Sequence, residues 1–89
     1  MEIEMIVFSQ RTDAVLDYGF EWDLADGESL FQSVCTVPAG LRKITQTMGV
    51  NITVVWLTGG TSGQDYTVSN HVTTDQGRED TKSFVLKVR

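Results

Sequence analysis

The two most reactive side-chain types, histidine and cysteine, occur once each in this chain. His71 is the only histidine and Cys35 the only cysteine, so a nucleophile activated by a neighbouring base would require these two residues to meet. In the strand pattern, His71 lies on the face opposite Val68 and Val72. Cys35 shares its face with Val37 and has the character of a small core residue. We therefore predict no catalytic residues and no enzyme; an activity lost on Cys35→Ser or His71→Ala would reverse that conclusion.

The spacing of the acidic residues gives little support to a metal site. Asp23, Asp26 and Glu28 are close in sequence, and Ca²⁺ binds carboxylate oxygens from neighbouring loop positions. Their spacing does not follow the EF-hand pattern, and aspartate and glycine are also the residues that a turn favours. One histidine and one cysteine do not make a zinc site without carboxylates or another chain's ligands. We expect no metal ion and no cofactor.

The glycine-rich segment GGTSGQ, residues 59–64, lacks the ending of a phosphate-binding loop. Such a loop ends in Gly-Lys-Ser/Thr and continues into a helix, and neither feature follows here. Glycine reaches positive φ without steric cost, so the chain can reverse between Thr58 and Asp65. We interpret the segment as a connection between two strands.

Alternation of apolar and polar residues predicts strands along most of the chain. Two patterns are the clearest, with one face formed by Leu16, Tyr18, Phe20 and Trp22 and another by Tyr66, Val68, Asn70, Val72 and Thr74. The predicted strands cover residues 1–8, 14–22, 30–37, 41–48, 52–57, 65–74 and 78–89. About seven strands separated by turns are typical of an all-β fold, a single immunoglobulin-like or fibronectin type III-like β-sandwich.

Three large aromatic residues are expected inside this sandwich. Trp22 and Trp56 are in phase with apolar residues of their strands, Trp56 with Ile52 and Val54. We therefore interpret them as core residues rather than as an exposed aromatic surface that binds a ligand. Tyr66 begins its strand, where immunoglobulin-like folds often carry a tyrosine whose hydroxyl bonds back across the corner.

The first residues form a separate part of the predicted architecture. We divide the chain into an N-terminal arm or extra strand at residues 1–13 and the immunoglobulin-like sandwich at residues 14–89. Apolar residues occur on both faces late in the first segment, at Ile6, Val7 and Phe8, so it could pack on two sides, one of them a neighbouring subunit. The alternative is an edge strand or a partly ordered arm.

The charge and the cysteine content of the chain limit the classes of partner and the compartment that we expect. The 89 residues include 7 Lys and Arg against 12 Asp and Glu, and Arg42-Lys43 is the only basic pair. Because proteins that bind a phosphate backbone concentrate Lys and Arg on one face, we expect protein partners and no nucleic acid. A lone cysteine permits no intramolecular disulfide and fits a reducing cytoplasm. The acidic N-terminus and its short apolar run predict no export signal and no membrane contact.

Five short segments connect the chain to a known family. They are DAVLDYGFEW at 13–22, LADGESL at 24–30, TVPAGL at 36–41, VWLTGGTSGQDYTV at 55–68 and VTTDQGRED at 72–80. From Ala14 onward the chain resembles a family of small bacteriophage and prophage proteins, the phage fibre-tail adaptor proteins, in which matching segments occur in the same order.

The resemblance implies a non-enzymatic structural component of a bacteriophage tail that connects tail fibres to the tail tube or neck. It also implies an immunoglobulin-like fold, a homo-oligomeric ring, and a place in the virion tail after assembly in the bacterial host cytoplasm. The alternative function is a phage-borne carbohydrate- or host-surface-binding immunoglobulin-like module. That module needs an exposed aromatic platform, whereas Trp22 and Trp56 are predicted to be internal.

The contacts of such an adaptor are expected in two places. One is the arm, because it is apolar on both faces, and the other is the glycine loop, because it is exposed. The predicted interface residues are Ile3, Met5, Ile6, Val7, Phe8, Gly59, Gly60 and Gly63.

Overall fold

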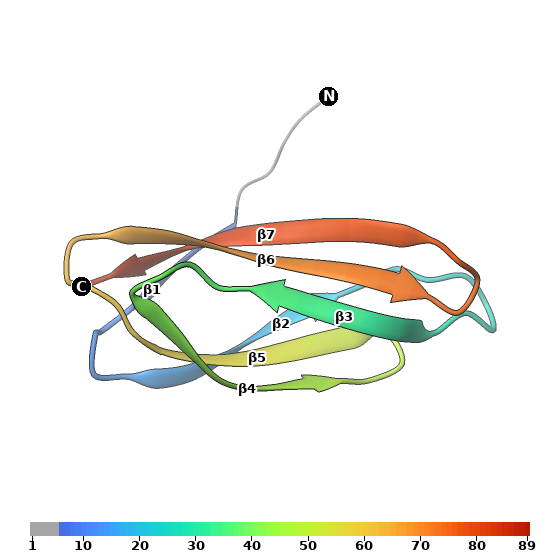
Figure 1. The fold of residues 1–89 in the computed structure, drawn as a ribbon, viewed down its shortest axis with the longest axis horizontal. Coiled ribbons are helices and arrows are strands. Elements are labelled where there is room, and N and C mark those ends of the chain that lie inside the picture. Colours follow the sequence, from blue (N-terminus) through green and yellow to red (C-terminus); the bar gives the residue numbers. More distant parts are fainter. Residues whose placement is uncertain (1–5) are drawn as a thin grey trace, which may run out of the picture.

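The computed structural model describes residues 6–89, which form seven strands and no helix. The strands are β1 (Ile6–Gln10), β2 (Val15–Glu21), β3 (Leu30–Thr36), β4 (Leu41–Met48), β5 (Ile52–Gly59), β6 (Asp65–Thr74) and β7 (Glu79–Val88). They make one sheet in the order β1-β7-β6-β3 and another in the order β2-β5-β4. The two sheets face each other as a sandwich (Figure 1). The predicted all-β sandwich is confirmed.

The core lies between the sheets and is built from alternate side chains of the strands. Val68, Asn70 and Val72 of β6 are buried, and so are Tyr18 and Phe20 of β2. Side chains of successive strand residues point to opposite faces, so each strand gives the core every second residue. Both alternating patterns seen in the sequence are therefore confirmed.

The buried face of β5 is the opposite of the predicted one. Thr53, Val55 and Leu57 are completely buried, whereas Trp56 lies on the outer face. Apolar residues occur on both faces of β5, so alternation within the strand does not decide which face is buried. Pairing with β2 decides it, because Tyr18 is opposite Val55 and paired residues of neighbouring strands point to the same side.

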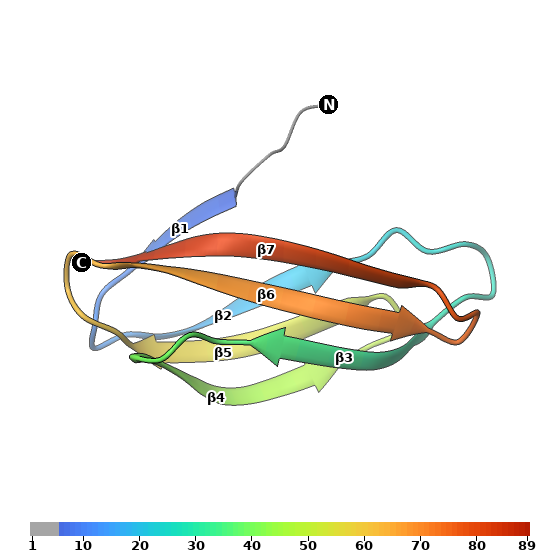
Figure 2. The ribbon, with the colours of Figure 1, turned by 45° about the horizontal axis from the view of Figure 1, so that its top comes forward.

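β1 runs parallel to β7 and forms one edge of the four-stranded sheet. After β1 the chain crosses to the opposite sheet and continues as β2 (Figure 2). Phe8 packs inward, with its ring centre 4.9 Å from that of Tyr18 and 5.2 Å from that of Phe84. Part of the segment predicted as an arm or extra strand is thus a sheet strand, while the division of the chain at residue 13 stays a prediction.

Gln10 joins β1 to the second sheet. Its amide nitrogen donates to the carbonyl oxygens of Ala14 and Leu57, both at 2.9 Å, and its oxygen accepts a hydrogen bond from the Tyr18 hydroxyl at 2.5 Å. The side chain is buried, and these partners satisfy both ends of its amide group. The network holds the end of β1 against the sandwich.

Tyr66 closes the connection between β5 and β6. Its hydroxyl accepts a hydrogen bond from the backbone N–H of Thr61 at 2.8 Å, the backward bond that the sequence predicts. The ring lies close to two glycines: a Cβ on Gly40 would be 3.3 Å from the hydroxyl, and one on Gly60 would be 3.1 Å from Cε2. This corner is a feature of immunoglobulin-like sandwiches and supports that identity, which stays a prediction.

Candidate functional site

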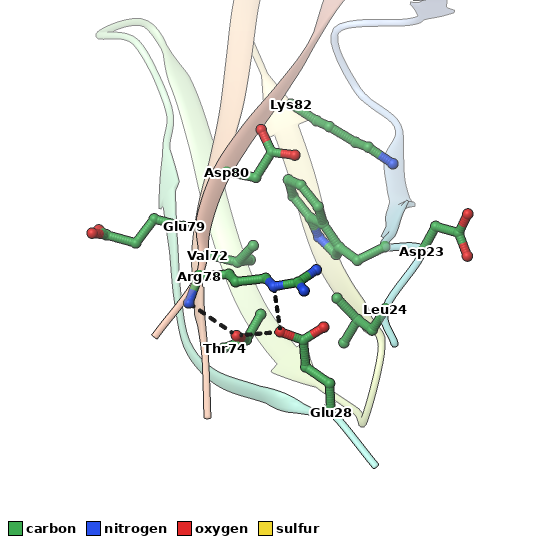
Figure 3. Close-up of a pocket in the computed structure, with 10 residues that line it drawn as sticks. Asp23, Leu24, Glu28, Val72, Thr74, Arg78, Glu79, Asp80 and Lys82 are labelled. Carbon is green, nitrogen blue, oxygen red and sulfur yellow. Dashed lines mark hydrogen bonds and ion pairs between the residues drawn. The ribbon is translucent and has the colours of Figure 1, made fainter. Parts of the chain in front are cut away.

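A pocket lies at one end of the sandwich, between the start of β7 and the loop that follows β2 (Figure 3). Trp22, Leu24 and Val72 give it apolar walls, and charged side chains surround them. Its volume of about 230 Å³ is below the range of about 300–1,000 Å³ that is usual for small-molecule sites. Arg78 extends across the pocket towards Glu28. The pocket is therefore small and partly filled by its own charged side chains.

Glu28 is the buried acid of this pocket. Its Oε2 accepts a hydrogen bond from the Thr74 hydroxyl at 2.7 Å, and its Oε1 accepts one from the backbone N–H of Ala25 at 3.1 Å. Arg78 Nε lies 3.7 Å from the carboxylate. The hydrogen bond from Thr74, then that from Ala25, and the nearby Arg78 lower the pKa of Glu28. Through these hydrogen bonds, the carboxylate holds the loop that contains Glu28 against β6.

Glu28 should make the stability of the sandwich depend on acid pH. A carboxylate with a lowered folded-state pKa stabilises the fold above its ordinary pKa of 4.5, and this contribution is lost as the pH falls through the lowered value. We expect the Tm of the wild-type chain to fall more steeply below pH 4.5 than that of Glu28→Gln, which does not titrate. Circular dichroism melts between neutral pH and acid pH measure both slopes.

The matched control for that experiment is Glu21→Gln, which changes an exposed carboxylate on β2. Its pH profile should follow the wild-type profile. Equal slopes for the wild-type chain and Glu28→Gln would contradict the assigned role of Glu28.

His71 and Cys35 do not meet. His71 is exposed on β6, with Nδ1 2.7 Å from Oγ1 of Thr81 and Nε2 3.0 Å from a carboxylate oxygen of Glu79. Cys35 lies at the core, where its Sγ accepts a hydrogen bond from the Asn70 amide at 3.5 Å, and burial raises the pKa of its thiol. The two side chains lie on opposite faces of their sheet, so the nucleophile and base pair weighed from the sequence is not formed.

The acidic residues considered for calcium do not form one cluster. Asp23 and Glu28 both line the pocket, but the Glu28 carboxylate is bound by Thr74 and Ala25. In residues 6–89, no group of three or more His, Cys, Asp or Glu side chains is placed to hold a metal ion. The part of the chain that the structure describes has no helix long and apolar enough to cross a membrane.

The two tryptophans have different surroundings. Trp22 is 4% exposed, its indole N–H donates to Oδ1 of Asn70 at 3.1 Å, and the Lys82 ammonium lies 4.8 Å from its ring centre. Trp56 is 37% exposed on the outer face of the three-stranded sheet. The prediction of an internal tryptophan is confirmed for Trp22 and wrong for Trp56.

An apolar ridge, defined as Ile52, Val54 and Trp56, follows the outer face of β5. Asp17 of β2 and Thr45 of β4 pair with Trp56 on its two sides. The ridge combines an indole ring with neighbouring carboxylate and hydroxyl groups, a composition suited to binding a protein or a carbohydrate. Sequence reasoning missed this surface, although apolar residues on both faces of one strand were a signal for it.

The predicted interface residues of the N-terminal segment lie partly within the structure. Ile3 and Met5 lie outside the described residues. Ile6, Val7 and Phe8 belong to β1, and their exposed fractions are 56%, 51% and 38%. β1 therefore presents apolar surface at an edge of the sandwich, and its contact with a partner stays a prediction.

The predicted interface glycines have positive φ but different surroundings. The φ values of Gly59, Gly60 and Gly63 are 84°, 88° and 89°. Gly60 packs against Tyr66 and Val88, so the fold itself requires the absence of a side chain there. No heavy atom outside its own segment lies within 4 Å of a Cβ built on Gly63. Contact of this loop with a partner also stays a prediction.

Comparison with known proteins gives a match over nearly the whole sandwich. A family model described as "Podophage GP4 fiber-tail adaptor protein gp77" matches residues 10–87. The match begins at the last residue of β1, so the three exposed apolar residues of that strand precede it. A search of curated proteins found no match.

Proposed function

This chain belongs to the podophage fibre-tail adaptor protein family, and from that premise we propose that it connects tail fibres to the tail tube or neck as a non-catalytic structural part. The observation that carries the proposal is the family match over residues 10–87, which covers most of the chain. Family membership implies a structural adaptor in the virion. The attachment to the tube or neck, and assembly in the host cytoplasm, are parts of the proposal.

Several features of the sandwich support a role without catalysis. The only cysteine and the only histidine lie on opposite sides of their sheet. The pocket beside Trp22 is small, and its buried acid is bound by Thr74 and the chain's own backbone. What the sandwich offers instead is edge and face surface with exposed apolar side chains. Such surface suits a protein that works through contacts with other proteins.

In this proposal the chain forms a ring of copies around the tail, and each copy contacts a fibre and the tube or neck. The fibre and tube contacts involve β1, through Ile6, Val7 and Phe8, and the glycine loop at residues 59–63. An exposed apolar edge strand can bind a partner by strand addition or by apolar packing.

Replacing Ile6 and Val7 together by serine tests the adaptor role in assembled phage. Both side chains are more than half exposed, so the free energy of unfolding should change by less than about 1 kcal/mol. We expect particles carrying this double variant to lose most of their fibre protein, measured by mass spectrometry against the tail-tube protein. Phe8 is left unchanged because its ring packs on Tyr18.

The matched control is Val50→Ser, which removes an exposed apolar side chain outside the predicted interface. These particles should keep the normal ratio of fibre to tube protein. Particles that lack the chain entirely should have no fibres, and fibres at the normal ratio in such particles would refute the adaptor function.

The apolar ridge favours a second candidate function, a carbohydrate- or host-surface-binding module. Exposed indole rings stack on sugar faces, and Trp56 is the aromatic platform that this function requires. Under this alternative, particles with serine at positions 6 and 7 keep their fibres, and the purified chain binds host cell envelopes. The family match favours the adaptor.

A further inference from the structure

The two edge strands of the three-stranded sheet carry opposite charges. β2 contains Asp17 and Glu21 and no basic residue, whereas β4 contains Arg42 and Lys43 and no acidic residue. Because the strand order is β2-β5-β4, these charges lie at opposite edges of one sheet. Within residues 6–89, none of the four side chains takes part in an ion pair.

Each charged edge also exposes apolar side chains. Val15 and Leu16 on β2 have exposed fractions of 50% and 44%, and Ile44 and Met48 on β4 are both 45% exposed. Interfaces between proteins typically combine an apolar centre with a polar, charged rim. Both edges have this composition, with charges of opposite sign.

One pair of opposite charges, Arg42 and Asp17, stands at nearly the same height along the two edges, whereas Glu21 pairs with Ile52 at the other end of β2. Arg42 and Val15 both pair with Thr58 of β5, so they lie level with each other across the sheet. Asp17 follows two residues after Val15 and therefore lies on the same face. If a second copy lies edge to edge at the same height, Arg42 faces Val15, and its long side chain can reach the neighbouring Asp17 on the same face.

The charges also decide which edges can meet. Two β2 edges would repel each other as acids, and two β4 edges would repel each other as bases, so only β2 against β4 brings opposite charges together. The register of β4 shifts between Lys43 and Thr45, which interrupts a continuous ladder. We therefore base the contact on the charged and apolar side chains of the two edges rather than on a continuous backbone ladder.

We infer that copies of this chain associate head to tail, with the acidic β2 edge of one copy against the basic β4 edge of the next. The occupant of each edge is thus a second copy of the same chain. A contact between two different surfaces of one protein repeats from copy to copy and closes into a ring when the rotation allows it. The inference specifies the residues of the ring proposed above and rests on that proposal.

Reversing the charge of each edge separately tests the contact. One variant carries Arg42→Glu and Lys43→Glu, and the other carries Asp17→Lys and Glu21→Lys. Each variant alone has two edges of the same sign, so its amount in purified particles, relative to tail-tube protein, should fall at least about tenfold. When both variants are produced in the same infected cell, each supplies the edge that the other needs. Incorporation should then return.

The matched control for the Arg42 and Lys43 reversal carries Lys87→Glu and Arg89→Glu, which lower the net charge by the same amount at exposed positions outside the three-stranded sheet. It should be incorporated normally. The neutral variant Arg42→Gln with Lys43→Gln should show a smaller loss than the reversal. If a charge-reversed chain fails to fold, this neutral variant still tests the contact.

The possible outcomes separate the edge contact from the adaptor function. Normal incorporation of each reversed variant alone, or no recovery when two folded variants are combined, would overturn the head-to-tail contact. Absence of the wild-type chain from particles would instead refute the proposed function. We expect the wild-type chain to be present in particles and each charge-reversed variant to be excluded when it is produced alone. Both variants should be incorporated when they are produced together.

Discussion

Replacing Gly60 with alanine is expected to destabilise the sandwich by about 3 kcal/mol, because two costs add at this position. Its φ is 88°, in the left-handed region, where a side chain costs about 1–2 kcal/mol. An added Cβ would also lie 2.7 Å from Cγ2 of Val88 and 3.1 Å from Cε2 of Tyr66. Such overpacking costs about 1–3 kcal/mol more.

Neither neighbour of Gly60 can easily move away. Val88 is buried at the end of β7, and the Tyr66 hydroxyl holds the backbone of Thr61. The backbone of Gly60 is itself bound, since its N–H donates to the carbonyl of Gly40 at 3.0 Å. The loss of about 3 kcal/mol is a large part of the stability of about 5–15 kcal/mol that is usual for a folded domain.

Gly63 supplies the matched control for this experiment. Its φ of 89° is almost the same, but a Cβ there has no neighbour within 4 Å. Gly63→Ala should therefore incur only the backbone cost of about 1–2 kcal/mol. Urea denaturation followed by circular dichroism measures both variants. Equal losses would mean that the contacts with Tyr66 and Val88 contribute nothing, contrary to the close packing of this corner.

The strands of the fold could be predicted from the sequence where one face alone is apolar. β2 and β6 are such strands, because polar residues such as Asp17 and His71 mark the face opposite to Tyr18 and Val68. The hydroxyl bond of Tyr66 could also be predicted, since it depends on a position at the start of a strand. Local patterns suffice for features that a single strand decides.

Features that depend on two strands at once could not be predicted. The buried face of β5 follows from its register with β2, and the wrong choice of face put Trp56 inside. The role of Glu28 depends on Thr74, which lies far along the chain, so its sequence context indicated only a turn. The positions of the acidic and basic residues at opposite edges of one sheet follow from the strand order β2-β5-β4, which the sequence alone does not give.

Asn70→Ala is expected to destabilise the sandwich by about 3 kcal/mol, because this buried amide joins β6 to β3 and to Trp22, which directly follows β2. Its Oδ1 accepts the indole N–H of Trp22 at 3.1 Å, and its amide nitrogen donates to Oγ of Ser33 at 2.7 Å and to the carbonyl of Val34 at 3.3 Å. Alanine leaves the buried indole N–H without an acceptor, and an unsatisfied buried group costs about 1–3 kcal/mol. The cavity left by the missing amide adds to that cost.

Two measurements separate this role from a general loss of packing. Thr67→Ala removes an exposed side chain of the same strand and should change the free energy of unfolding by less than about 0.5 kcal/mol. In the wild-type chain, the indole N–H of Trp22 should exchange with solvent much more slowly than that of Trp56, because only Trp22 is buried. Asn70→Ala should remove most of this protection. An indole N–H of Trp22 that stays protected in the variant would mean that it has another acceptor, and that Asn70 does not hold the segment after β2 against β6.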